Sequence, residues 1–284
     1  MELDAILEDD AARRDAALAA AAAAPEHERS ALAAKLGAIV KDAAAALAAA
    51  EEAGGETTAH AARLGRACVG LSLLRVEVAK SALLRVADEG TPTVKAALAH
   101  ALRASETAEG RAVLVHLLSD DDAQADAVLA IGAGPWPEVL PALIEVAEAN
   151  DRVARLAATP IATCGATAGP KEMNAAADFL LEQLDDDVVL PAAVDALLRL
   201  GNGFPGVAAK GKRIAKEPGT RKVAGLCLVA AFGEEGKASL LELALSGTKV
   251  DEDNARAFLG PLLEDGDERI RGAAERTWKA LDLR

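Results

Sequence analysis

Apolar residues recur with a helical period along most of the chain, and the pattern is clearest between residues 179 and 201. The apolar positions of the second half of this segment fall on one face of a helix, and they are Val189, Ala193, Ala196, Leu197 and Leu200. Gly201 follows them, where a glycine commonly ends a helix. Three aspartates at 185–187 separate this stripe from a first apolar pattern that starts at Phe179. Two short antiparallel helices cannot bury such a stripe on their own, so the pattern predicts a repeat.

Four segments place apolar or small residues at the same three positions ahead of a glycine. They are Ala127, Val128, Ile131 and Gly132; Pro160, Ile161, Cys164 and Gly165; Ala196, Leu197, Leu200 and Gly201; and Leu228, Val229, Phe232 and Gly233. The glycines lie 33, 36 and 32 residues apart, close to the ~40 residues of helix-pair repeats. The spacing therefore predicts stacked helix pairs.

Two further segments carry a weaker form of the pattern. Upstream, TPTVKAALAHAL has Val94, Ala101 and Leu102 in register, with Thr91 or Pro92 opening the helix. At the end of the chain, DERIRGAAERTWKALD puts apolar residues in most of the same positions, but 49 residues separate its last aspartate from Gly233. We expect an irregular final layer, as is common where one face of a stack has no neighbour.

The second-helix pattern of Asp, then Val and Arg, then Ala, then Ala-Leu, then Leu-Gly resembles the HEAT-repeat family of α-solenoids. The match is best in the last copy, at Asp267, Ile270, Arg271 and Ala274. The central copy departs from it, with Leu190 in place of arginine, and Pro160 and Pro191 fall inside expected helices and should bend them. The resemblance covers residues 72–284. It implies an all-α fold, an α-α superhelix of antiparallel helix pairs, and it specifies no activity because solenoids host many functions.

Residues 1–71 lack the repeat register. Two long alanine-rich helical patterns, 3–23 and 26–53, are separated by Pro25. Their helix propensity favours an N-terminal helical cap over the first repeat, and a partly frayed coil is the alternative. We therefore divide the chain into a cap at 1–71 and HEAT-like repeats at 72–284.

Composition and charge narrow the choice of partner. Aromatic residues make up 2% of the chain, and the formal net charge is −14. Such a charge repels nucleic acid phosphates and anionic membranes, so we expect neither as a partner. The cysteines Cys68, Cys164 and Cys227 lie far apart within apolar patterns, as buried thiols in a reducing compartment do. With an acidic N-terminus and no long apolar stretch, the sequence predicts a cytoplasmic protein.

Motifs for catalysis, metals and cofactors fail on context. The four histidines form no HxxxH or HExxH pair, and the aspartate runs at 120–122, 185–187 and 251–253 lack calcium-loop spacing. We interpret these runs as helix caps. GNGFPG follows a helical pattern rather than a strand, and GVAAKGKR has Arg213 where a phosphate loop needs a hydroxyl. We expect no catalytic residues, no metal and no cofactor.

Three groups of residues are candidates for partner binding. A basic run breaks the acidic trend, and its members are Lys210, Lys212, Arg213, Lys216, Arg221 and Lys222. It is either a solvated helix face or a docking site for an acidic protein surface or a phosphate. Trp136 and Phe204 each precede a proline, as hydrophobic staples or as exposed anchors. Asp195 and Arg199 are expected to be exposed on a second helix.

These observations predict a non-catalytic scaffold that binds another protein through the concave face of a solenoid, lined mostly by second helices. The alternative is a HEAT-like DNA glycosylase, or another HEAT protein that binds nucleic acid or phosphate. A glycosylase needs a basic groove and aromatic residues near a carboxylate. The net charge of −14 and only two indoles, Trp136 and Trp278, argue against it.

Overall fold

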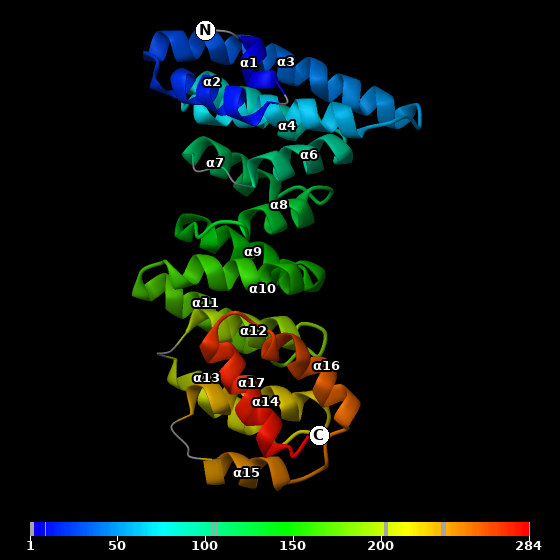
Figure 1. The fold of residues 1–284 in the computed structure, drawn as a ribbon, viewed down its shortest axis with the longest axis vertical. Coiled ribbons are helices and arrows are strands. Elements are labelled where there is room, and N and C mark those ends of the chain that lie inside the picture. Colours follow the sequence, from blue (N-terminus) through cyan, green and yellow to red (C-terminus); the bar gives the residue numbers. More distant parts are fainter. Residues whose placement is uncertain are drawn as a thin grey trace. The chain divides into compact units, whose positions relative to one another are not determined.

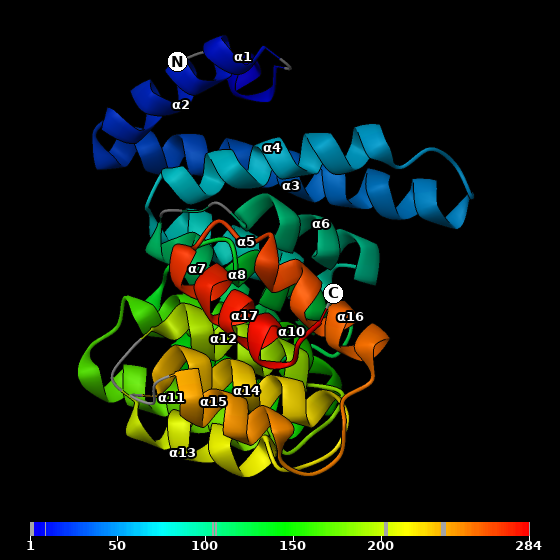
Figure 2. The same ribbon diagram turned by 60° about the horizontal axis from the view of Figure 1, so that its bottom comes forward.

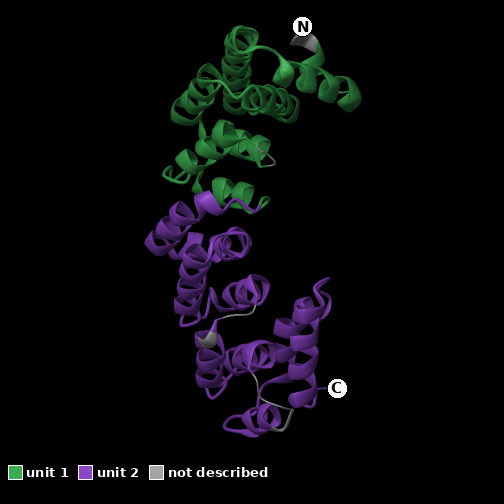
Figure 3. Ribbon diagram, turned by 90° about the vertical axis from the view of Figure 1, so that its left-hand side faces the viewer, with its two compact units in different colours: residues 1–134 green, residues 135–284 purple. Residues whose placement is uncertain are grey.

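The computed structural model describes residues 3–8, 10–103, 105, 107–201, 204–233 and 237–283. Throughout that part of the chain, all regular elements are helices and no strand occurs, which confirms the predicted all-α class. The chain forms two compact units, Met1–Gly134 and Pro135–Arg284, which Figure 3 colours separately. HEAT-family membership, a superhelix over the whole chain and the division at residue 71 stay predictions.

The first unit consists of helix pairs joined by short turns. Its helices are α1 (Leu3–Leu7), α2 (Ala11–Ala23), α3 (Glu26–Glu52), α4 (Thr58–Leu73), α5 (Glu77–Glu89), α6 (Pro92–Leu102), α7 (Ala108–Leu117) and α8 (Gln124–Ile131). Helices α3, α5 and α7 pack in one row, and α4, α6 and α8 pack in a second row. Figure 2 shows the long α3 and α4 lying side by side. The rows also include α3 and α4, although the sequence shows no repeat register over residues 1–71.

Helices α1 and α2 both pack against α4. Ile6 of α1 and Leu18 and Ala21 of α2 are buried. The contact depends on Gly70, where a β-carbon would lie 3.0 Å from Ile6 Cγ2. These two helices therefore have a hydrophobic face of their own against the first pair.

The second unit begins with a short 3-10 turn and continues as helices of ordinary length. They are η1 (Pro137–Val139), α9 (Leu140–Ala149), α10 (Asp151–Ala166), α11 (Pro170–Gln183), α12 (Leu190–Leu200), α13 (Pro205–Ile214), α14 (Thr220–Phe232), α15 (Lys237–Leu245), α16 (Glu252–Leu263) and α17 (Glu268–Ala280). Helices α10, α12 and α14 pack in succession as one row (Figure 1). Their predicted core stripes are buried, except that Phe232 is half-exposed.

The C-terminal helices do not extend this row as one further regular pair. Helix α17 packs mainly on α14 and also reaches α12, while α15 and α16 pack on α14 as well. Ile270, Ala273, Ala274 and Thr277 bury one face of α17. Helix α14 is consequently surrounded, and its residues 222–229 are all buried. This agrees with the expected irregularity of the last layer.

Two expectations about helix geometry need correction. Pro191 lies in the first turn of α12, where no intrahelical amide is required, so it does not interrupt the helix as predicted. Pro160 does lie inside α10, as expected. Gly201 adopts a φ of +94° after α12, whereas Gly165, predicted to end a helix, lies within α10. Glycine at that position is explained by packing, because a β-carbon would lie 2.8 Å from Ala176 Cβ.

Candidate protein-binding groove

Helix α3 presents an outward face made almost entirely of alanine. Its opposite face buries Leu36, Val40 and Leu47. The outward positions follow at intervals of four, three, four and three residues, and they are Ala34, Ala38, Lys41, Ala45 and Ala48. Because alanine side chains are short, they project little from the backbone of α3 along this face. An adjoining helix can therefore form a groove against it.

Helix α5 supplies the other wall of the groove. The two helices approach most closely at Gly37, where a β-carbon would lie only 3.3 Å from Ala82 Cβ. Beside this contact, every fourth residue of α5 lines the groove, namely Glu77, Ser81, Arg85 and Glu89. The groove has a volume of about 630 Å³, and its far end is lined by Gly90, Thr91 and Val94 at the start of α6. We call this hollow, between α3 and α5, the α3–α5 groove.

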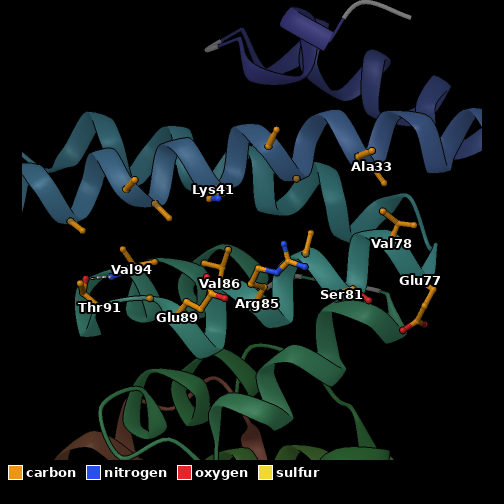
Figure 4. Close-up of a pocket in the computed structure, with 18 residues that line it drawn as sticks. Ala33, Lys41, Glu77, Val78, Ser81, Arg85, Val86, Glu89, Thr91 and Val94 are labelled. Atoms are coloured by element: carbon orange, nitrogen blue, oxygen red, sulfur yellow. Dashed lines mark hydrogen bonds between the residues drawn. The ribbon is translucent and has the colours of Figure 1, made fainter.

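The α3–α5 groove contains an exposed aliphatic side chain and two cations. Val78 of α5 is 46% exposed and lines the groove. Lys41 from α3 and Arg85 from α5 lie in the space between the two helices (Figure 4). Within the described ranges, neither cation has a carboxylate at ion-pair distance. The groove therefore combines small apolar walls with unpaired positive charge.

A second groove of about 800 Å³ lies on the other helix row of the same unit. It repeats the same construction, because a β-carbon at Gly65 of α4 would lie 3.6 Å from Ala101 Cβ of α6. Helix α2 contributes Leu18 to its wall, and its lining mixes the charges Arg14, Asp15, Arg66 and Asp126. Both grooves therefore carry charges of both signs, but in the second groove Arg14 and Asp15 lie 3.8 Å apart and pair with each other.

The basic run of the second unit is held mostly by its own chain. Lys210 Nζ lies 2.5 Å from Asp185 Oδ2, and Arg221 Nε lies 2.6 Å from Asp187 Oδ1. Arg213 approaches Asp185 at 3.5 Å. The hydrogen bond from Lys210 lowers the pKa of the Asp185 carboxyl. The aspartate run and the basic run, read separately in the sequence, are thus partners that fix the α11–α12 turn to α13 and α14.

Lys222 of the basic run differs in environment from these ion pairs. Lys222 is 1% exposed, and its ammonium donates to the backbone carbonyls of Ser246 and Thr248. Burial lowers its pKa. Lys212 and Lys216 are exposed. Partner binding by the run stays a prediction, and Lys222 has a structural role in holding the turn after α15.

The predicted surface pair on α12 is joined to the C-terminal helices. Arg199 contacts Asp195 at 2.9 Å and Asp265, in the α16–α17 turn, at 2.7 Å. Nearby, the Arg276 guanidinium of α17 donates to the Ala230 carbonyl in the last turn of α14, at 2.8 Å. Helix α17 thus covers part of the row formed by α10, α12 and α14. The sequence predicts that a protein partner binds there, on the second helices.

The pKa values of two carboxylates in the turn before α17, Asp265 and Asp267, are lowered. The side chain and backbone amide of Arg269 hydrogen-bond to the Asp267 carboxylate, and they lower its pKa to about 2. The backbone amide of Asp267 in turn lowers the pKa of Asp265, and Arg199 lowers it further. These carboxylates stay ionised wherever the protein is folded near neutral pH.

Trp136 and Phe204 occupy equivalent positions. Their backbone angles are nearly the same, with φ and ψ of −106° and 88° for Trp136 and −110° and 90° for Phe204. Each immediately precedes a helix that starts with proline, and each is half-buried. Two residues of the GNGFPG motif, Asn202 and Gly203, lie outside the described residues. The matching geometry agrees with a shared role in starting a layer, and anchoring of a partner stays a prediction.

The capping interpretation of the aspartate runs is correct for the run at 251–253, where Asp251 accepts from the Asn254 amide as the N-cap of α16. Asp120 and Asp186 instead accept from amides within the turns before α8 and α12, whose N-cap residues, Ala123 and Val189, make no side-chain cap bond. No group of three or more potential metal ligands occurs among the described residues. Desolvation raises the pKa of Cys68 and Cys227 to about 12, and that of Cys164 to about 11. Across the described helices, none is long and apolar enough to cross a bilayer.

Neither a protein-family model nor a curated protein matches the chain. The α3–α5 groove must therefore be judged by its own geometry. Reasoning from the sequence missed it, because the search for function followed the charged and aromatic residues of the second unit. The signal that could have found it is the stripe from Ala34 to Ala48, which has helical spacing and no large side chain.

Proposed function

We propose that this protein is a non-catalytic scaffold in a reducing, cytoplasmic compartment, and that it binds another protein. The interaction takes place in the first unit, in the α3–α5 groove. The observation that carries the proposal is the exposed small-residue wall of α3, with Lys41 at its centre and Arg85 on the facing wall of α5, two cations that have no carboxylate partner among the described residues. Stacked helix pairs of a HEAT-like solenoid are suited to this role, because their rows present long continuous surfaces.

The composition of the groove favours a macromolecular partner over a small substrate. Small-molecule sites are usually enclosed and contain aromatic side chains with a few convergent polar groups. The α3–α5 groove is lined mainly by alanine, glycine and valine, with one charged residue on the α3 wall and three on the α5 wall. It is better matched to a protein segment that covers its length.

The second unit supplies a weaker case for binding. Lys210, Arg213 and Arg221 already pair with aspartates, so an incoming acidic or phosphate group would have to displace them. The same pairing disfavours the glycosylase alternative. Arg256 also lies 5.1 Å from the centre of the Trp278 ring. One of the two indoles of the chain therefore already has a cation–π partner within the protein.

A comparative pull-down tests the proposal. The wild-type protein is used as bait beside Ala38→Trp, which places a large ring in the α3–α5 groove at an exposed position. A matched variant, Lys212→Glu with Lys216→Glu, changes exposed residues of the second unit. We expect at least one protein to be captured by the wild type and by the matched variant, at low and moderate salt, and to be lost with Ala38→Trp. Recovery of the same proteins by all three baits would contradict the proposal.

A further inference from the structure

We infer that the occupant of the α3–α5 groove is an amphipathic α-helix with a face of small side chains and with carboxylates near its middle. This inference rests on the proposed function, because it names the partner of the same groove. It follows from three properties of the groove: its length, the size of its lining residues and the position of its charges.

The length of the α3–α5 groove matches a short helix. The lining residues of α3 run from Ala33 to Ala48, which is about 22 Å at 1.5 Å per residue. Both α3 and α5 run from the end marked by Ala33 and Glu77 in Figure 4 toward the end marked by Val94. A helix of about four turns, laid along the groove, would contact the whole stripe.

The lining also sets how closely such a helix could approach. At Gly37 and Ala82 the walls themselves pack with almost no side chain between them. On α3 the side chains on either side of this contact are mostly methyl groups, and on α5 they are the Ser81 hydroxyl with Val78 and Val86 one turn away. A partner with alanine, serine or glycine at positions spaced three and four apart could bring its backbone near α3, and Val78 offers one larger apolar contact.

The charges define a pattern along the groove. Lys41 lies midway between Ala34 and Ala48, and Arg85 lines the facing wall. Glu77 lies at the end marked by Ala33, and Glu89 follows one turn after Arg85, before Thr91 and Val94 at the other end. Carboxylates near the middle of the partner would meet Lys41 and Arg85, and cations toward its ends would meet the glutamates. Because the whole chain carries −14, a uniformly acidic helix would be repelled at long range. The order of charges, rather than the net charge, is therefore what the groove can recognise.

Two labelled peptides of identical composition test this order. Both are alanine-rich helices of 18 residues with net charge zero. The first has two glutamates in the middle and a lysine toward each end, and the second has lysines in the middle and glutamates toward the ends. Fluorescence anisotropy is measured against the full chain at about 50 mM salt, where charge contacts are weakly screened. We expect the first peptide to bind at least tenfold more tightly.

Charge reversal in the protein gives the matched comparison. Lys41→Glu combined with Arg85→Glu should invert the preference, so that the second peptide binds better. The control, Lys35→Glu combined with Arg103→Glu, changes the same net charge at exposed positions of the same unit outside the groove. It should keep the wild-type preference. Circular dichroism of each variant confirms that the helices are retained.

Four results would overturn the inference. Equal binding of both peptides, or an unchanged preference in the charge-reversed protein, would show that Lys41 and Arg85 do not select the partner. Self-association in sedimentation that disappears in Ala38→Trp would identify the occupant as a second copy of this chain. If neither peptide binds but the pull-down partner is still lost with Ala38→Trp, the proposed function stands and the helical occupant is wrong.

Discussion

The two units pack their helices with different side chains: small residues predominate at the helix contacts of the first unit, and the second unit also contains aromatic residues. Residues 1–134 contain no aromatic residue, and the aromatic residues of the chain all lie in the second unit, at Trp136, Phe179, Phe204, Phe232, Phe258 and Trp278. In the first unit, α3 meets α5 and α4 meets α6 through glycine and alanine, and open grooves remain beside both contacts. Packing with small side chains brings helices close together, but it leaves their outer surfaces uncovered.

In the second unit, the C-terminal helices cover the surface of the helix row that they pack against. Helix α17 lies on α14 and α12, and α14 is buried along most of its length. Its cations are used to hold turns in place, as Arg221 does with Asp187 and Lys222 does with two carbonyls. The comparison shows that charge density in a sequence does not identify free charges, because the members of such a run can already have internal partners, as Lys210 has in Asp185. Under the proposed function, the binding surface is instead where cations without a carboxylate partner lie beside small residues.

The largest effect is expected at the closest helix contact of the second unit. A β-carbon at Gly225 would lie 2.3 Å from the Ala215 backbone nitrogen and 2.5 Å from the Gly211 carbonyl oxygen. Gly225→Ala should therefore lower the free energy of unfolding by about 3 kcal/mol or more. Urea denaturation followed by tryptophan fluorescence reports on this unit, since both tryptophans lie in it.

Gly260→Ala is the control for that substitution. Gly260 lies inside α16, and apart from its chain neighbours no atom lies within 4 Å of its would-be β-carbon. Because Pro261 follows and disfavours the helical conformation for a residue with a β-carbon, the helix propensity of alanine is offset. Gly260→Ala should therefore change the free energy of unfolding by less than about 1 kcal/mol. Similar effects of the two substitutions would contradict close packing at Gly225.

A smaller loss is expected from the buried cation. Lys222→Met removes both hydrogen bonds of the ammonium and leaves the carbonyls of Ser246 and Thr248 without that donor. We expect about 2 kcal/mol of destabilisation, measured by the same urea titration. Lys216→Met, at an exposed position of the same basic run, should change the free energy of unfolding by less than about 0.5 kcal/mol. Equal effects would mean that Lys222 is not the structural member of the run.

Acid should lower the stability of the second unit through protonation of Asp267, in the turn before α17. Because folding lowers the pKa of Asp267 to about 2, its ionised form contributes stability above the ordinary value of 3.8. That contribution is lost as the pH falls from about 4 to 2. Asp267→Asn keeps a capping side chain but loses the titration. Its thermal midpoint should therefore fall less than that of the wild type between pH 5 and pH 2.5, by a few degrees. Parallel decreases in both proteins would refute this role for Asp267.

The smallest expected difference between the units is in the reactivity of their cysteines, Cys68 in the first unit and Cys164 and Cys227 in the second. Burial raises the pKa of Cys68 and Cys227 to about 12, so almost no thiolate forms at pH 8 and alkylation of the native protein should be very slow. In intermediate urea we expect Cys68 to react before Cys164 and Cys227, because aromatic side chains add much of the buried area that resists opening. Mass spectrometry of alkylated peptides gives the order. Earlier reaction of Cys164 or Cys227 would contradict the proposed difference between the units.

Most of the fold could be predicted from the sequence, because helical periodicity records which face is buried. The stripe of α12 and the capping role of Asp251 followed directly from spacing. The position of α17 could not be predicted in the same way. Its repeat pattern resembles that of a regular layer, but whether a helix extends a row or lies across it depends on contacts between distant residues, such as Arg199 with Asp265.

The candidate site was less predictable than the fold. Attention to charged and aromatic residues led to Lys210 and Arg221, whose partners Asp185 and Asp187 come from a turn more than twenty residues earlier in the chain. The alanines of α3 attracted no functional interpretation, since alanine is abundant and chemically inert. Their significance arises only when Gly37 brings α5 close enough to make a second wall.

Photo-crosslinking in the native cell tests the central claim most directly. A photoreactive phenylalanine analogue is placed at Ala38 or Ala45 in the α3–α5 groove and, for comparison, at Lys212 or Lys216 in the second unit. If the groove is the binding surface, a discrete adduct with another protein should form from Ala38 and Ala45 and be absent from Lys212 and Lys216. Adducts formed only from the second unit, with none from the groove, would contradict the account.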